Sequence, residues 1–198
     1  WVSTLRVNRS AVERRAATLG TRRSVKKEWQ AAWLLKAITL MELTTLAGDD
    51  TEERVRRLCA KARQPVRRDL LEAMGMPSDA IRVGAVCVYH QMVPAAVSAL
   101  AGSGIRVAAV STGFPHGLSP IPQRIAEIKA SVAAGAREID IVVTRGHVLT
   151  GNWQALYDEV RSCREACGDA HIKTILATGE LAMLRNVAKA SLVCMMAG

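Results

Sequence analysis

Residues 138–143 read Glu138-Ile139-Asp140-Ile141-Val142-Val143, a short β-branched run that is built for burial apart from its acids. Comparable runs occupy residues 38–46, 83–89, 106–111 and 172–178. Most of them are apolar nearly throughout, which is typical of strands that are covered on both faces. Segments with helical spacing separate the runs. This alternation predicts an α/β fold with a parallel sheet and right-handed crossovers.

Two architectures fit such a pattern, an open doubly wound sheet and part of a (β/α)8 TIM barrel. The glycine-rich motifs GxGxxG and GxxxxGK[ST] do not occur, which disfavours the nucleotide-binding versions. In either architecture we expect the reactive groups at the carboxyl ends of the strands.

Helix signals lie between the runs. The spacing of Asp50 and Glu53 fits a capping box that opens a helix, and Asn152 can cap the helix that carries Trp153. Pro122 suits the first turn of another helix. A last helix is expected from Glu180, with Leu184, Val187, Ser191 and Met195 facing inward.

The composition is that of a globular protein, because 49% of the 198 residues are apolar and 23% are charged. No apolar run of membrane-spanning length occurs, so we expect no membrane association. The five cysteines form an odd set without a secretory signal, which favours reduced thiols and a cytoplasmic location. Neither CxxC nor HExxH is present, so we expect no metal site.

The charge is uneven along the chain. Residues 1–36 carry nine basic and two acidic residues, which is +7 of the total of +9. We interpret 1–36 as a basic helical N-terminal extension and 37–198 as the α/β domain. A nucleic-acid-binding arm is the competing hypothesis, but no recognition motif accompanies the charge, so we do not expect a nucleic-acid partner. Trp29 and Trp33, four residues apart, are expected to pack one face of this extension on the domain.

Polar residues inside the apolar runs are the candidates for chemistry. A buried Asp140 is costly unless it is paired, so it either transfers protons or belongs to a structural ion pair. Lys173 can pair with Asp140, undergo a pKa shift for amine chemistry, or extend its ammonium to the edge of the barrel.

Cys87 and Glu42 lie in two further runs. Cys87 is either a small buried hydrophobe or a thiol that lines a pocket. Glu42 can accept hydrogen bonds from ligand hydroxyls or pair with a basic core residue.

Six segments together resemble deoxyribose-phosphate aldolases, closest to the longer animal-type members. They are residues 40–46, 49–51, 85–89, 112–117, 138–142 and 176–181, in the right order and spacing. The resemblance implies a class I aldolase on a (β/α)8 barrel, without a cofactor or metal. It implies reversible cleavage of 2-deoxy-D-ribose 5-phosphate, a phosphorylated sugar, to acetaldehyde and D-glyceraldehyde 3-phosphate through a Schiff base on lysine.

The same resemblance implies site residues. Asp140 matches the proton-relay carboxylate, Thr44 and Cys87 match positions that line the substrate site, and Lys173 matches a polar strand residue near it. Glu42 departs from the aspartate that is usual in the family, which leaves open whether substrate preference changes.

The Schiff-base lysine of the family lies on a sixth strand, after the position of Gly198. We therefore expect about five of the eight βα units here, and a 198-residue chain that is inactive and poorly soluble by itself. An inactive truncated fragment or a partner-binding isoform is the alternative to a working aldolase. The oligomeric state, including a homo-oligomer, is left open by the sequence.

Overall fold

Five parallel strands form one sheet in the order β1-β2-β3-β4-β5. The computed structural model describes residues 2–22 and 25–198. The strands are β1 (Glu42–Thr44), β2 (Ala85–Tyr89), β3 (Arg106–Ser111), β4 (Glu138–Val142) and β5 (His171–Ile175). Each described strand pairs with its neighbour in the sequence. This order has no reversal, so it is the order of a (β/α)8 barrel and excludes the doubly wound alternative.

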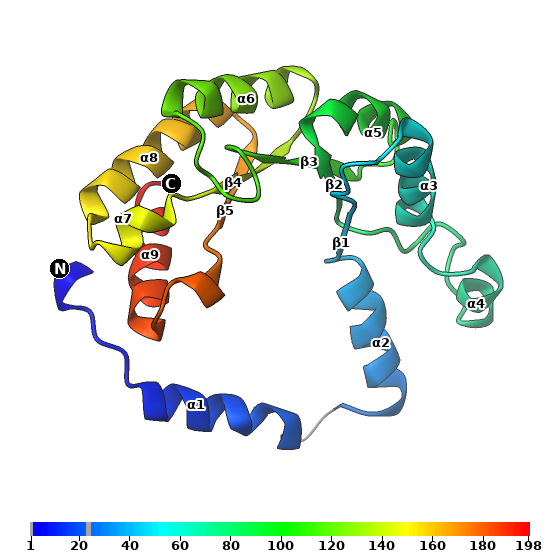
Figure 1. Ribbon diagram of the computed structural model, residues 1–198. Helices are drawn as coiled ribbons and strands as arrows, with labels where there is room; N and C mark the ends of the chain where they lie inside the picture. Colours follow the sequence, from blue (N-terminus) through cyan, green and yellow to red (C-terminus); the bar gives the residue numbers. More distant parts are fainter. Residues whose placement is uncertain (1, 23–24) are drawn as a thin grey trace.

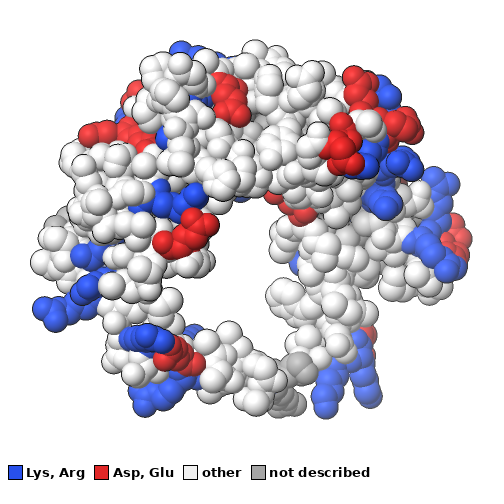
Figure 2. Space-filling model, in the orientation of Figure 1, with Lys and Arg blue, Asp and Glu red and all other residues white. Residues whose placement is uncertain are grey.

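Helices lie on the outer face of the curved sheet (Figure 1). The α-helices of the domain are α3 (Glu52–Arg63), α4 (Arg68–Ala73), α5 (Val93–Ala99), α6 (Ile121–Ala133), α7 (Arg145–Leu149), α8 (Trp153–Cys167) and α9 (Leu184–Met196). Two 3-10 turns, η3 (His90–Met92) and η4 (Thr178–Glu180), precede α5 and α9. The sheet and helices form an arc around a central opening (Figure 2). The arc corresponds to five of the eight units of a barrel.

The two faces of the sheet differ in what they pack against. Val86, Val88, Ile139 and Ile141 belong to the main core with the helices. The alternate positions, which include Cys87 and Asp140, point to the inner face, where a small second cluster forms around Cys87. The outer face therefore stabilises the fold, and the inner face is available for chemistry.

The helix starts follow the sequence in two places and differ in one. Asn152 accepts a hydrogen bond from the N–H of Ala155, and a proline lies in the first turn of α6, both as predicted. At α3 the cap is Thr51, which accepts from the N–H of Arg54, and not Asp50. Asp50 instead accepts hydrogen bonds from the Thr45 hydroxyl and the Ala47 N–H.

Three predicted segments were wrong in extent or orientation. The run 172–178 is a strand only as far as Ile175, because Ala177 has a φ of +50° and Thr178 begins η4. Only Glu42–Thr44 of the run 38–46 is a strand, because Ile38 still belongs to α2. In α9 Leu184 and Met195, both expected to face inward, are 39% and 66% exposed, while Lys189, Ala190, Val193 and Cys194 are buried. The helix begins at Leu184, four residues later than expected, after the turn η4.

The N-terminal segment comprises η1 (Val2–Thr4), α1 (Arg9–Ala17), η2 (Leu19–Thr21) and α2 (Lys27–Ile38). Its helices have no buried residue, and Trp29 and Trp33 are 67% and 62% exposed, so their predicted packing on the domain was wrong. Contact with the domain is made by η1, where Lys189 Nζ donates to the Ser3 carbonyl at 2.8 Å. The division at residue 36 falls within α2 and stays a prediction. None of the helices in the described ranges combines the length and apolar composition of a membrane span.

Position 117, in the loop after β3, requires a glycine, because both its backbone conformation and its neighbours exclude a side chain. Its φ is +68°, and a Cβ would lie 2.8 Å from Val142 Cγ1 and 3.1 Å from the Val142 carbonyl oxygen. Gly117→Ala is expected to lower the free energy of unfolding by about 2–4 kcal/mol, because strain and overlap add. Urea denaturation measures the change. Gly48→Ala, whose added Cβ would meet nothing within 4 Å, is the control. Equal effects of the two substitutions would contradict this account.

Candidate active site

The register of the sheet brings Asp140 and Lys173 side by side on the inner face. Asp140 pairs with Val110 on β3 and with Lys173 on β5. Glu138 lies two residues before Asp140 and therefore points to the same face. Polar groups from separate strands thus meet inside the arc.

Lys173 lies at the centre of this cluster, surrounded by three carboxylates. Its Nζ is 2.7 Å from Glu42 Oε1, 3.1 Å from Asp140 Oδ1 and 3.2 Å from Glu138 Oε2. The side chain of Asp140 is 11% exposed and that of Lys173 is 36% exposed. Of the alternatives open for Lys173, pairing with Asp140 is the one that the structure shows. Of the alternatives open for Glu42, the structure likewise shows pairing with a basic residue, which is Lys173.

Burial and charge shift the pKa values of this cluster. Burial raises the pKa of Asp140 above its usual value, although the nearby charge of Lys173 acts in the opposite direction. Burial alone would lower the pKa of Lys173, but hydrogen bonding to Glu42 and the charge of Asp140 outweigh it, and the pKa is raised. Glu138 is also paired with Arg106 Nη1 at 3.3 Å, so two basic groups face three carboxylates and one negative charge is left over. The cluster therefore suits proton transfer through Asp140 more than nucleophilic attack by Lys173.

Cys87 is 2% exposed and its thiol lies 4.0 Å from Asp140 Oδ2. Burial, and then the charges of Asp140 and Glu42, raise the pKa of the thiol to about 12. The thiolate fraction at pH 8 is then about 10³-fold lower than for a free cysteine. We expect iodoacetamide to label Cys87 much more slowly in the native protein than in urea, as followed by peptide mass spectrometry. Equal labelling rates in the two conditions would contradict the buried, protonated thiol.

Glu42, Cys87 and Asp140 also bring three ligand atoms within 4.8 Å of one another, which is a spacing that metal ions use. The ammonium of Lys173 lies against two of these three groups, at 2.7 and 3.1 Å. It places a positive charge between the two carboxylates. The geometry is that of an internal ion-pair cluster.

Thr44 is the outlying member of the predicted set. It is the exposed last residue of β1 and pairs in register with Cys87. No hydrogen bond joins Thr44 to the cluster within the described part of the chain. The structure thus brings Asp140, Lys173 and Cys87 together and leaves Thr44 at the rim.

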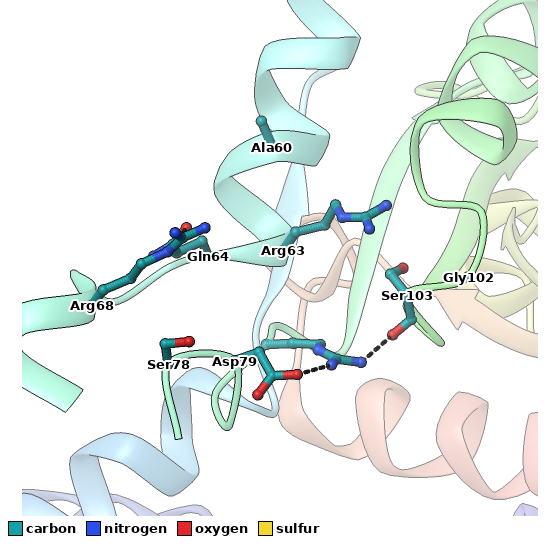
Figure 3. A pocket seen from close by; sticks show the side chains of 9 residues that line it. Ala60, Arg63, Gln64, Arg68, Ser78, Asp79, Gly102 and Ser103 are labelled. Atoms are coloured by element: carbon teal, nitrogen blue, oxygen red, sulfur yellow. Dashed lines mark hydrogen bonds and ion pairs between the residues drawn. The ribbon is translucent and has the colours of Figure 1, made fainter. Parts of the chain in front are cut away.

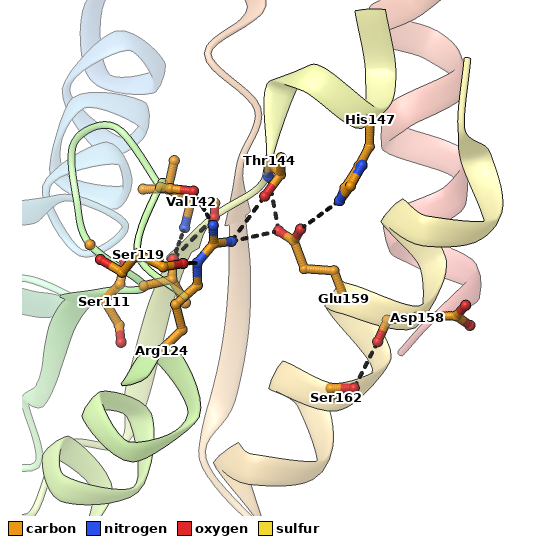
Figure 4. Close-up of polar contacts among 12 residues, drawn as sticks. Ser111, Ser119, Arg124, Val142, Thr144, His147, Asp158, Glu159 and Ser162 are labelled. Carbon is orange, nitrogen blue, oxygen red and sulfur yellow. Dashed lines mark hydrogen bonds and ion pairs between the residues drawn. The ribbon is translucent and has the colours of Figure 1, made fainter. Parts of the chain in front are cut away.

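A second polar network fixes the loops at the carboxyl ends of β3 and β4 (Figure 4). Arg124 of α6 donates to the carbonyl oxygens of Gly117 and Ser119 and, at 3.0 Å, to Thr144 Oγ1. It also lies 3.2 Å from Glu159 Oε1, and the two side chains are only 5% and 3% exposed. Glu159 Oε1 accepts from the Thr144 N–H at 2.8 Å, so one ion pair ties two loops to two helices.

Sequence reasoning missed Glu138, Arg124 and Glu159. Each of them had a signal in the spacing of buried residues. Glu138 follows the two-residue period from Asp140, and Arg124 lies four residues before the buried Ile128, one turn along the same helix face. Glu159 is likewise three residues after the buried Leu156. A charged residue on a buried stripe needs a partner, but the sequence does not identify which one.

Known proteins are similar to this chain in sequence and in fold. A family model described as DeoC/LacD family aldolase matches residues 36–196. The chain is 59% identical over 200 residues to deoxyribose-phosphate aldolase of Mus musculus, and 56% identical to that of Homo sapiens. Each comparison covers all of this chain, which spans 63% of the length of each relative.

Solved structures agree on the fold. A tetrameric deoxyribose phosphate aldolase from Aeropyrum pernix superimposes with a TM-score of 0.62 at 21% identity, over 83% of this chain and 62% of that one. The aldolase QR15 gives a TM-score of 0.67 at 22% identity, over 81% of this chain and 64% of that one. With five parallel strands in barrel order and a family match over most of its length, the chain belongs to the DeoC/LacD family of aldolases.

Proposed function

We propose that this chain contributes the first five strands of a deoxyribose-phosphate aldolase. The reaction is the reversible cleavage of 2-deoxy-D-ribose 5-phosphate to acetaldehyde and D-glyceraldehyde 3-phosphate. The observation that carries the proposal is the inner-face cluster, in which a carboxyl with a raised pKa lies 3.1 Å from a fixed ammonium. The identity to the mouse and human aldolases supports the same substrate.

Asp140 is proposed to accept and return protons. A lysine amine attacks the aldehyde carbon of the open-chain sugar and releases water as the Schiff base forms. Loss of the hydroxyl proton at C3 breaks the C2–C3 bond, and the electron pair moves into the iminium to give an enamine. Protonation of the enamine and hydrolysis then release acetaldehyde. The carboxyl of Asp140 suits these proton transfers because its pKa is shifted toward neutrality.

Lys173 is proposed as a binding and positioning residue. Its pKa is raised by Glu42 and Asp140, so the amine is held as ammonium and lacks the lone pair that attack requires. The nucleophilic amine is therefore proposed to come from a sixth strand beside β5, as the family resemblance implies. Thr44 and Cys87 are proposed to line the substrate site, at the rim and at the floor.

The test uses the protein isolated from its natural source, with its intact mass measured first. Incubation with 2-deoxy-D-ribose 5-phosphate and borohydride should trap the substrate as a stable adduct on one lysine, which peptide mass spectrometry locates. The expected site is a lysine other than Lys173. Cleavage without an adduct, or an adduct on Lys173, would overturn the proposed roles.

A homo-oligomer and a cytoplasmic location are also proposed. The tetrameric Aeropyrum pernix aldolase supports the first. The five cysteines are all free and buried, which fits a reducing compartment and supports the second. Light scattering of the purified protein and imaging of a tagged copy test these two statements.

A further inference from the structure

A pocket lies outside the barrel interior, at the amino ends of β2 and β3 (Figure 3). Its cavity volume is about 410 Å³, which is within the range of small-molecule sites. The wall is formed by the end of α3, the start of α4, the segment before β2 and the turn before β3. The loops that follow the strands begin at the opposite edge of the sheet, so this pocket is separate from the candidate active site.

Three arginines from separate segments line this pocket, and two of them are held by main-chain oxygens. Arg63 Nη1 donates to the carbonyls of Ala99 and Ala101 at 3.1 and 3.2 Å, and Arg82 Nη1 donates to that of Ser103 at 2.8 Å. Carbonyl acceptors fix a guanidinium without neutralising its charge. The arginines are thus oriented before any ligand arrives.

Positive charge in the pocket exceeds negative charge. Its one acid is Asp79, which pairs with Arg82 at 2.9 Å. Arg63 and Arg68 form no ion pair with a carboxylate in the described residues, and Arg68 is held through Nε by Gln64 Oε1 at 3.2 Å. Basic side chains gather over α3 and α4 at the right of Figure 2. An anion that accepts several hydrogen bonds would supply the counter-charge that Arg63 and Arg68 lack within the described residues.

We propose that this pocket binds a phosphate monoester of a small polyhydroxy compound, such as a sugar phosphate. The phosphate group contacts Arg63 and Arg68, whose forked donors match its oxygens. The hydroxyl groups of the ester meet Ser78, Asp79 and Gln64, which also line the cavity. Gly102 leaves room at the wall, because a Cβ there would meet nothing within 4 Å.

Ribose 5-phosphate is the probe, titrated into the ¹⁵N-labelled full chain at constant ionic strength. Saturable amide shifts are expected at Gly102 and Ser103, with a Kd of roughly 0.1–1 mM because the site is open to solvent. Ribose without the phosphate should cause no shift there, and inorganic phosphate should bind more weakly than the ester. Reading the shifts at this pocket separates the result from any binding near Asp140.

Arg68→Gln is the main variant, because Arg68 is exposed and its substitution leaves the core intact. It should weaken binding about tenfold, as expected for one charge-assisted contact. Arg57→Gln, an exposed charge on α3 outside the pocket, is the matched control and should change the affinity by less than about twofold. Absence of saturation below about 10 mM, equal effects of the two variants, or inorganic phosphate binding as tightly as the ester would each overturn the proposal.

Discussion

Asp140→Asn is expected to lower kcat for aldol cleavage by at least about 100-fold, because the amide cannot accept and return a proton. The side chain keeps its shape, and Glu42 and Glu138 still hold Lys173 at 2.7 and 3.2 Å. KM for 2-deoxy-D-ribose 5-phosphate should therefore change little. A coupled assay of the released glyceraldehyde 3-phosphate measures both constants, with the protein from its natural source as the parent enzyme.

Asp140→Asn should not lower the free energy of unfolding at pH 7, although it lowers the activity. The folded-state pKa of Asp140 is raised above its unfolded value, so the folded protein binds the proton more tightly. Stability then falls as the pH rises from the unfolded pKa, about 3.9, through the folded pKa. Asp140→Asn removes this fall, and the variant should be as stable as the parent at pH 7 or more stable.

Asp158→Asn is the control for the first prediction, since Asp158 is exposed on α8 and its carboxylate accepts a hydrogen bond only from Gln154 in the described residues. It should leave kcat unchanged. If Asp140→Asn keeps more than about a tenth of the parent kcat, this carboxylate does not take part in the proton transfers.

Arg124→Met should lower the free energy of unfolding by about 3–5 kcal/mol, the largest stability effect that we expect in this chain. Methionine keeps most of the volume but leaves Glu159 buried without its counter-charge. It also leaves the carbonyls of Gly117 and Ser119 without their donor. His147 Nε2 lies 3.4 Å from Glu159 Oε2 and replaces only part of the lost interaction. Urea denaturation at pH 7 measures the loss.

Two further variants isolate the buried charge as the cause. Arg124→Met combined with Glu159→Gln should regain about half of the loss, because the glutamine oxygen still accepts from the Thr144 N–H without a charge. Arg161→Met breaks an ion pair whose members are 54% and 66% exposed, and should have no measurable effect. If Arg124→Met costs no more than Arg161→Met, the network does not hold the two loops.

The sequence predicted the strands best where burial is continuous. The runs that contain β2, β3 and β4 are mostly buried on both faces, and their expected bounds differ from the structure by no more than two residues. The run 38–46 is also apolar, but it contains the end of a helix and a three-residue strand. Hydrophobicity alone does not separate these two cases, because a short apolar run lacks a diagnostic period.

The sequence predicted which residues belong to the candidate site better than it predicted how they are arranged. Asp140 and Lys173 stand out because a charge in a buried strand must find a partner. The distances from Lys173 to Glu42 and Glu138 depend on the register and curvature of the sheet, which join residues up to 131 positions apart. The exposed positions of Trp29 and Met195 could not be predicted either, since helical spacing indicates a face but not what lies against it.

Strand order also has a consequence for how the chain acquires its structure during synthesis. Every described strand pairs with the strand before it, so each new strand closes only the loop that separates it from its predecessor. The sheet can grow by one βα unit at a time as the ribosome releases the chain, without waiting for distant segments. Pulsed hydrogen exchange on nascent chains should show protection spreading from β2 toward β5. Glu42 and Asp140 then lie on the growing sheet without a basic partner until β5 adds Lys173.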